Sequence, residues 1–298
     1  LNKYGFNQVT SEKTIGLYQN NNASQLAILT DGIYKNIDFT VNTLDNQTSL
    51  LNALSGLNLN YFKRAPSQLF DQDAKSLNQR VAKNVSNSNK DFVTITYRVI
   101  APPHSQLYVS IPNISWSDDN NHSLSITVNG VTRNQVTDNT FDFFDLGYFE
   151  TESMVTIKLS FPGNKAISFD NPSFYALDTQ NYKIAMDTIN ERDTKVTTSK
   201  NKVFTDYSSH TNASLFFTIP YDKGWTATVN NKKVKIHRAQ KGFMKVDVPS
   251  GKGKVVLTFI PYGLKIGLII SCLAFGIFCC YAYFIGKIKI TQKATRPK

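Results

Sequence analysis

The stretch Ser123–Gly130 reads SLSITVNG and decides how this chain folds. Three apolar residues in it alternate with serine and threonine, which is the period-two pattern of a strand with one buried face. Asn129 and Gly130 end the stretch, and this pair tolerates the positive φ angles of a type I′ turn. The stretch therefore predicts a β-strand that opens a hairpin.

Strands are expected on both sides of this hairpin. Val155–Phe161 has the same alternation, with four apolar residues on one face. Two more apolar runs, Phe92–Ile100 and Leu107–Ile111, are separated by Pro102-Pro103, which cannot continue a strand. The region is therefore expected to be mainly β.

The same plan returns later in the chain. Leu215–Ile219 ends before a proline, as Leu107–Ile111 does, and Thr226–Asn231 resembles Ser125–Gly130. From Val128 to Val155 is 27 residues, and from Val229 to Val255 is 26. We predict two tandem β-sandwich-like modules of related design, with a chance likeness between β-rich segments as the alternative.

Two helices are predicted among these strands. Leu177–Glu191 places Tyr182, Ala185, Met186 and Ile189 at helical spacing, and Asp178 or Thr179 can cap its start. A shorter helix is expected at Thr48–Leu57, where three leucines share a face.

The run Ile266–Ile285 (IGLIISCLAFGIFCCYAYFI) contains no charged side chain. As a helix it would be about 30 Å long, the thickness of the hydrocarbon core of a bilayer. The tail after it is basic and contains no acid, which predicts a cytoplasmic tail and an extracellular position for residues 1–262. Lys252, Lys254 and Lys265 at the other end weaken this asymmetry without reversing it.

The expected organisation has six parts. They are an irregular connecting segment with a short helix (1–60), a first β-sandwich module (61–170), a helical connector (171–195), a second module (196–262), a transmembrane helix (263–286) and a basic cytoplasmic tail (287–298). Because the chain begins at Leu1 without an export signal, we expect an earlier membrane span to carry the modules across.

Composition restricts the partners. All three cysteines fall inside the apolar run, so the external part has no thiol, which suits a bacterial surface. Before Leu264 there are 27 basic and 22 acidic residues, a net charge of +5 that favours anionic polymers or lipid headgroups. Nucleic acid is not expected, because no basic cluster is interleaved with aromatic residues.

Signatures of catalysis are missing from the sequence. The four histidines are scattered without metal-ligand spacing, so no metal, cofactor or catalytic residue is predicted. Asp71-Gln72-Asp73 resembles the D-x-D pair that holds a metal–nucleotide complex in some glycosyltransferases. We favour a solvated loop there, since so short a pattern often arises by chance.

Binding candidates lie in Ile219–Trp225 (IPYDKGW) and at Trp116. One interpretation is a stacking platform for a sugar ring, made by Tyr221 and Trp225, with Asp222 and Lys223 bonding its hydroxyls or a phosphate. The other is a rigid corner in which Trp225 fills the core of a module. Trp116 follows a strand in a polar loop and poses the same choice.

The segment from Ile219 through the start of the apolar run, with NPSFYALD (171–178) and DNQTSLLNALSG (45–56), resembles the C-terminal part of the YfhO family of multi-spanning bacterial membrane proteins. Asn231 stands where that family more often has glycine. The resemblance implies a GT-C membrane glycosyltransferase of a Gram-positive bacterium, which transfers a sugar from a polyprenyl-phosphate carrier to lipoteichoic or wall teichoic acid. It also implies that the catalytic carboxylate lies on an early loop of the whole protein, so this portion would be non-catalytic and serve acceptor binding or capping.

Two other functions stay open. The chain could be a membrane-anchored wall- or carbohydrate-binding surface protein without enzymatic activity, or a degenerate fragment without function. Apolar spans encoded upstream of Leu1 would indicate the transferase, and a signal peptide would indicate the binding protein.

Overall fold

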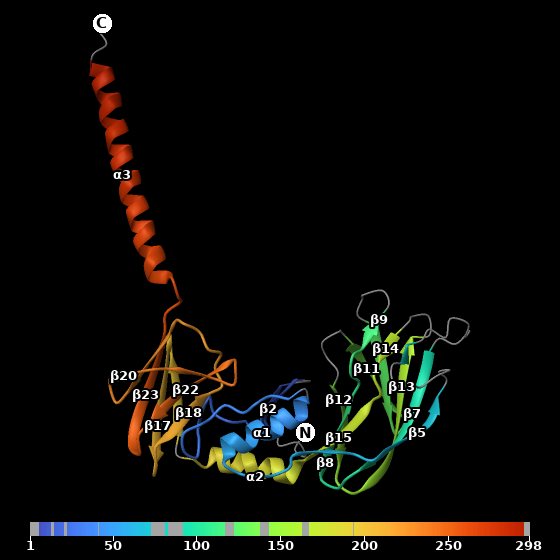
Figure 1. The fold of residues 1–298 in the computed structure, drawn as a ribbon. Helices are drawn as coiled ribbons and strands as arrows, with labels where there is room; N and C mark the ends of the chain where they lie inside the picture. The colour runs from blue at the N-terminus through green and yellow to red at the C-terminus, as the bar shows by residue number, and fades with distance from the viewer. Residues whose placement is uncertain are drawn as a thin grey trace. The chain divides into compact units, whose positions relative to one another are not determined.

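The computed structural model describes residues 6–12, 15–20, 23–40, 42–72, 81–82, 92–116, 122–137, 143–162, 167–192 and 194–294. Within these ranges the chain is mainly β, with helices α1 (Thr43–Ser55), α2 (Thr179–Asn190) and α3 (Leu264–Ala294) (Figure 1). The predicted class, a mainly β chain followed by one apolar helix, is confirmed.

The chain divides into two compact units. The first contains Leu1–Ala23 and Ile37–Glu191, and the second contains Ser24–Asn36 and Arg192–Lys298. The prediction of an irregular segment up to residue 60 missed strands in it: β1 (Phe6–Glu12) pairs with β2 (Ile15–Asn20), and β3 (Ala27–Leu29) joins a sheet of the second unit. The partner of β3 lies almost 190 residues away in sequence (Leu29 pairs with Leu215), so no local pattern indicated it.

The first unit contains a sandwich of antiparallel sheets, in the orders β11-β10-β13-β7-β5 and β12-β8-β15-β4. The strands are β4 (Phe62–Arg64), β5 (Ser67–Gln72), β7 (Phe92–Ala101), β8 (Ser105–Ser110), β10 (His122–Val128), β11 (Val131–Thr137), β12 (Phe143–Phe149), β13 (Ser153–Pro162) and β15 (Ser173–Asp178). A smaller sheet has the order β6 (Val81–Ala82), β14 (Ile167–Phe169) and β9 (Ser115–Trp116). The apolar face predicted for β13 is buried in the core between the larger sheets.

The second unit is a sandwich as well, in the orders β16-β17-β23-β19-β20 and β21-β22-β18-β3. The strands are β16 (Thr194–Ser199), β17 (Lys202–Ser209), β18 (Ala213–Phe217), β19 (Trp225–Val229), β20 (Lys232–Val234), β21 (His237–Ala239), β22 (Phe243–Val248) and β23 (Gly251–Phe259). Side chains from β3, β17, β18, β19, β22 and β23 form its core.

The strand orders confirm the repeat that the sequence suggested. Read from its hairpin, β20-β19-β23-β17-β16 has the same plan as β11-β10-β13-β7-β5, and β22-β18-β3 has the plan of β12-β8-β15. Strands β15 and β3 occupy equivalent positions in the two sandwiches. In sequence, β15 comes after the other strands of the first sandwich, whereas β3 comes before those of the second. The two modules are therefore related in topology but not in the order of all their strands.

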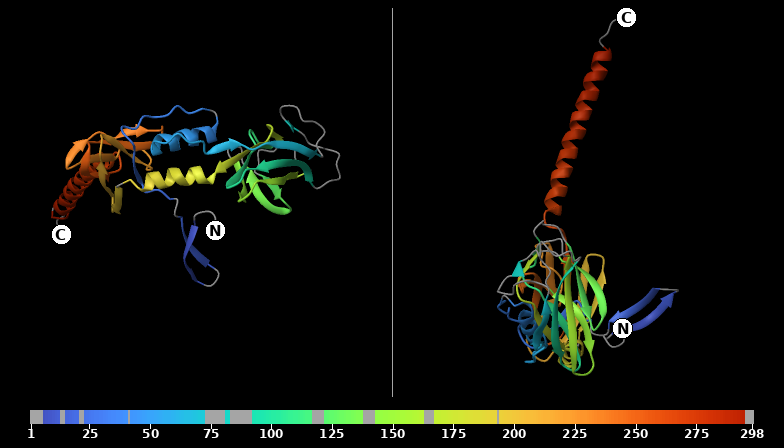
Figure 2. Two further views of the ribbon diagram at one scale, coloured as in Figure 1. Left: turned by 90° about the horizontal axis from the view of Figure 1, so that it is seen from below. Right: turned by 90° about the vertical axis from the view of Figure 1, so that its right-hand side faces the viewer.

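Helices α1 and α2 lie side by side in the first unit (Figure 2). Helix α2 begins after Asp178, whose carboxylate accepts the Asn181 N–H at 3.0 Å, and it buries Ala185, Met186 and Ile189, as predicted. Helix α1 begins earlier than predicted, because the Asn42 side chain caps its first turn.

Helix α3 follows directly from the second unit's sandwich (Figure 1). Its segment Leu264–Ile285 is 22 residues long and contains a window of 18 residues with a mean hydropathy of 2.3, which the rest of the described chain does not cover. Phe275 and Ile277 are 68% and 71% exposed. A helix this apolar and this uncovered has the length and composition to cross a membrane.

Candidate functional site

The segment Pro220–Trp225 forms a rigid corner between β18 and β19. The carboxylate of Asp222 accepts the N–H of Gly224 at 2.6 Å, which closes an Asx turn, and the N–H of Trp225 donates to the Asp222 carbonyl at 3.2 Å. A Cβ on Gly224 would lie 2.3 Å from the carbonyl oxygen of Ile260, so only glycine fits. Asp222 and Gly224 therefore have structural roles in this corner.

Trp225 packs against the core of the second unit. Its ring centroid lies 4.9 Å from that of Phe259, and the side chain is partly buried. Tyr221 packs on the same core and carries the Arg238 guanidinium 5.0 Å from its ring centroid. This arrangement favours the interpretation of a rigid corner, in which Tyr221 and Trp225 are both partly buried residues.

The corner is joined to the segment that leads into α3. The N–H of Ile260 donates to the Gly224 carbonyl at 3.0 Å, and the Lys223 ammonium lies 5.6 Å from the Tyr262 ring centroid. Tyr262 is 76% exposed and stands two residues before Leu264, where the apolar span begins. The corner thus lies next to the start of the candidate membrane span.

Trp116 occupies a different kind of position. It lies in β9, is 3% exposed, and donates its indole N–H to the hydroxyl of Thr137 at 2.7 Å. Its ring contributes to the core of the first unit together with Phe161. Trp116 is thus a core residue of the first unit, whereas the corner residues belong to the second unit.

Among the described residues, no group of three or more His, Cys, Asp or Glu could hold a metal ion. Asp71 is exposed at the end of β5, and Asp73, its partner in the D-x-D pattern, lies outside the described residues.

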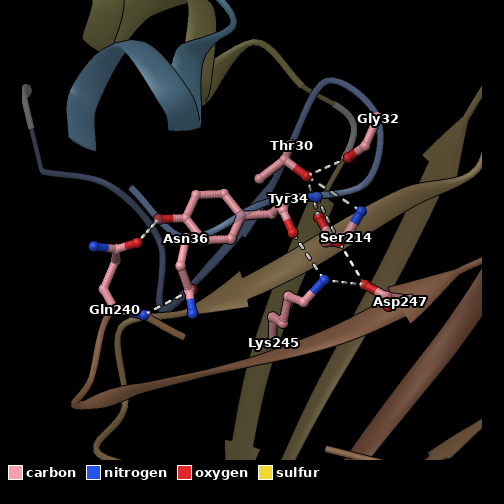
Figure 3. Close-up of polar contacts among 8 residues, drawn as sticks. All are labelled: Thr30, Gly32, Tyr34, Asn36, Ser214, Gln240, Lys245 and Asp247. Carbon is pink, nitrogen blue, oxygen red and sulfur yellow. Dashed lines mark hydrogen bonds and ion pairs between the residues drawn. The ribbon is translucent and has the colours of Figure 1, made fainter. Parts of the chain in front are cut away.

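A polar cluster that sequence reasoning missed fastens residues 30–36 to β18 and β22 (Figure 3). Ser214 lies at its centre: its hydroxyl accepts the N–H of Tyr34 at 3.0 Å and donates to the Asp247 carboxylate at 2.6 Å. The Lys245 ammonium lies 3.0 Å from that carboxylate and 2.8 Å from the Tyr34 carbonyl oxygen. No sequence signal could have found this cluster, because its members come from segments about 180 residues apart.

The charges and hydrogen bonds of this cluster shift the pKa values of two of its members. Burial raises the pKa of Asp247, but hydrogen bonds from Ser214 and Lys245 and the charges of Lys245 and His237 outweigh it, and the net pKa is lowered. Burial raises the pKa of Tyr34, whose hydroxyl donates to Gln240 Oε1 at 2.7 Å. The Ser214 hydroxyl accepts from the Tyr34 N–H and donates to the Asp247 carboxylate, so it joins the segment 30–36 to β22.

These features define a β-sandwich protein with a C-terminal helix able to cross a membrane. The family model for "Bacterial membrane protein YfhO" matches residues 1–271, and the chain belongs to that family. It is 26% identical over 125 residues to the "Uncharacterized protein YfhO" of Bacillus subtilis (strain 168), a match that covers 39% of this chain and 14% of that protein. Membership in this family, together with α3, makes this a membrane protein.

Solved structures show distant likenesses. A cycloisomaltooligosaccharide glucanotransferase from Paenibacillus sp. matches 67% of this chain and 46% of its own at 10% identity, with a TM-score of 0.27. A tandem CBM22 domain from Paenibacillus barcinonensis matches 67% of this chain and 86% of its own at 9% identity, with a TM-score of 0.21. TM-scores this low do not establish a common fold.

Proposed function

We propose that this chain is the extracytoplasmic C-terminal portion of a membrane glycosyltransferase that transfers a sugar from a polyprenyl-phosphate carrier to a cell-wall polymer such as lipoteichoic or wall teichoic acid. The observation that supports this is the family match, which runs through both sandwiches and into the apolar helix. A lipid-linked donor requires an active site at the membrane, which is where a chain with this helix is held.

Within the whole protein, this portion is non-catalytic. In its described residues, Asp222 closes the turn of the corner, and Ser214 joins the segment 30–36 to the sandwich. The basic tail lies in the cytoplasm and residues 1–262 lie outside, since positive charge favours the cytoplasmic side.

The portion serves acceptor binding or capping of the catalytic part. For acceptor binding, the surface consists of the partly exposed residues Tyr221 and Trp225, with Lys223 for a phosphate and Asp222 holding the turn. Its position beside the start of α3 supports this assignment, because a lipid-linked sugar and its acceptor would meet at that level.

The test of the activity is the sugar content of the wall polymers. In a strain lacking the whole protein, lipoteichoic and wall teichoic acid are extracted and their sugar-to-phosphate ratio is measured by NMR. We expect the ratio of one polymer to fall and to recover when the whole protein is restored. An unchanged ratio in both polymers would reject the transferase and leave a binding protein without chemistry.

The role of this portion is tested by binding to purified teichoic acid across a salt series. The soluble fragment must begin at Ser24, because one that begins at Tyr61 would lack β3 and expose the edge of β18. For acceptor binding, we expect affinity that falls with salt and with the change of Tyr221→Leu, and that is kept in Lys252→Gln. Absence of binding at low salt would leave capping as the role.

A further inference from the structure

Charge is distributed very unevenly between the two units. Ahead of Leu264, the second unit has 14 Lys and Arg against 5 Asp and Glu, a net charge of +9. The first unit has 13 against 17, a net charge of −4. The net charge of +5 before the span is therefore the sum of an acidic first unit and a strongly basic second unit. Helix α3 follows from the second, basic unit.

Several turns meet at the end of the second unit where β23 finishes. Phe259 N–H donates to the carbonyl of Asn201 at 2.9 Å, which places the β16–β17 turn there. The N–H of Tyr221 donates to the Gly242 carbonyl at 2.8 Å, which places the β21–β22 turn beside the corner. We call this surface the juxtamembrane end.

Exposed basic side chains gather on the juxtamembrane end. They are Lys200, Lys202, Lys223, Arg238 and Lys241. The acid among them, Asp222, is engaged with the Gly224 N–H. Two tyrosines lie between the cations: Tyr221 under Arg238, and Tyr262 near Lys223. Cations interleaved with tyrosine are typical of the level of the lipid headgroups, where an aromatic ring has one apolar and one wet side.

The chain itself holds this end close to the membrane. Ile260 is bonded to the corner, and only three residues separate it from Leu264. Even fully extended, a link of that length reaches no more than about 14 Å. Ile260, and with it the corner to which it is bonded, therefore stays within roughly two Debye lengths of the start of the span at physiological salt.

We propose that the juxtamembrane end binds the phosphates of anionic phospholipids in the leaflet that α3 enters, and so holds the second unit against the membrane. This inference rests on charge, position and the apolar helix, and it does not depend on the proposed transferase activity. Attraction of lysine and arginine to anionic lipid falls off within a Debye length, which predicts strong sensitivity to salt.

The test is lysine footprinting of the full chain in nanodiscs. An uncharged acetylating reagent and mass spectrometry report the rate at each lysine, in discs of phosphatidylcholine with or without phosphatidylglycerol. We expect phosphatidylglycerol to slow acetylation of the juxtamembrane lysines by about fivefold, and about 0.5 M salt to restore it. Lysines at the opposite end of the same sandwich, Lys232, Lys233 and Lys252, should react alike in both discs.

Two triple variants that remove the same number of charges distinguish an effect of where the charges lie from an effect of the total charge. Lys223→Gln with Arg238→Gln and Lys241→Gln removes three charges from the juxtamembrane end, and Lys232→Gln with Lys233→Gln and Lys252→Gln removes three from the opposite end. We expect the first triple variant to lose the protection of Lys200 and Lys202, and the second to keep it.

Three results would overturn the proposal. They are equal acetylation rates in the two kinds of disc for the unmodified chain, equal behaviour of the two triple variants, and protection by soluble poly(glycerol phosphate) without protection by phosphatidylglycerol. The last result would show that the juxtamembrane end binds a phosphate polymer and not phospholipid.

Discussion

Asn129 and Asn230 make the same pair of hydrogen bonds in the two sandwiches. The side-chain oxygen of Asn129 accepts the N–H of Thr156 at 3.0 Å, and that of Asn230 accepts the N–H of Lys254 at 2.9 Å. Each asparagine also donates its own N–H to the carbonyl of the same partner, at 3.0 and 2.9 Å. Each thus fastens a hairpin turn to the neighbouring long strand, β13 or β23.

Replacing Asn230 with alanine should destabilise the second unit by about 1–2 kcal/mol, because one hydrogen bond is lost and alanine is strained at a φ of 50°. Asn230→Gly keeps the backbone conformation and loses only the side-chain bond, so it should cost less. Hydrogen exchange of β19 and β20 measures both changes. Equal effects of alanine and glycine would show that the backbone conformation contributes nothing.

The fastening cluster should make stability depend on pH. Because the pKa of Asp247 is lowered in the folded state, its contribution is present above the unfolded pKa near 4 and is lost as pH falls through the folded value. Urea unfolding of the native chain and of Asp247→Asn should therefore differ at pH 7 and converge in acid. A difference that stays constant from pH 7 to about pH 2.5 would contradict this assignment.

Tyr34→Phe should loosen the segment that carries β3. The change removes the donor to the buried Gln240 Oε1, at a cost of about 1–2 kcal/mol. Lys35, exposed in the same segment, gives trypsin a cleavage site, and cleavage there should be faster in the variant. An unchanged cleavage rate, with a native circular dichroism spectrum, would show that the other hydrogen bonds of the cluster are enough to hold this segment in place.

Gly224→Ala should be severely destabilising, by about 3 kcal/mol, because its Cβ would meet the Ile260 carbonyl and the Phe259 ring. Gly242→Ala is the matched control: it lies beside the same corner, its Cβ would have 4.0 Å to the nearest atom, and it should be nearly neutral. Thermal unfolding compares the two. A tolerated Gly224→Ala would mean that β23 and the corner are not joined as the structure has them.

Trp116→Phe should reduce the stability of the first unit by about 1–3 kcal/mol, because the buried hydroxyl of Thr137 loses its indole partner. It should leave binding to teichoic acid unchanged, since the ring is in the core. Urea unfolding and the binding assay measure the two effects. A loss of binding at unchanged stability would return Trp116 to the role of a sugar platform.

Local sequence determined the elements with a strong pattern. Alternation along β10 and β13, the Asn129–Gly130 turn, the apolar face of α2 and the apolar run in α3 were all predictable, because each depends on neighbours a few residues apart. The helix α3 itself continues to Ala294, beyond the predicted end at residue 286. The repeat was also visible, since equivalent turns carry equivalent asparagines. Even the two interpretations of Ile219–Trp225 followed from residue type and turn chemistry.

Tertiary structure alone decided which distant segments share a sheet and which rings are buried. The sequence shows no link between β3 and β18, because a three-residue strand is stabilised by pairing and by the cluster around Ser214. It shows Trp116 in a polar loop, yet pairing of β9 with β14 carries the ring into the core. The hydrogen-bond partners of a strand's backbone and the side chains that bury a ring come from segments far away in sequence. Which residues pair and which are buried is therefore decided only in the folded chain.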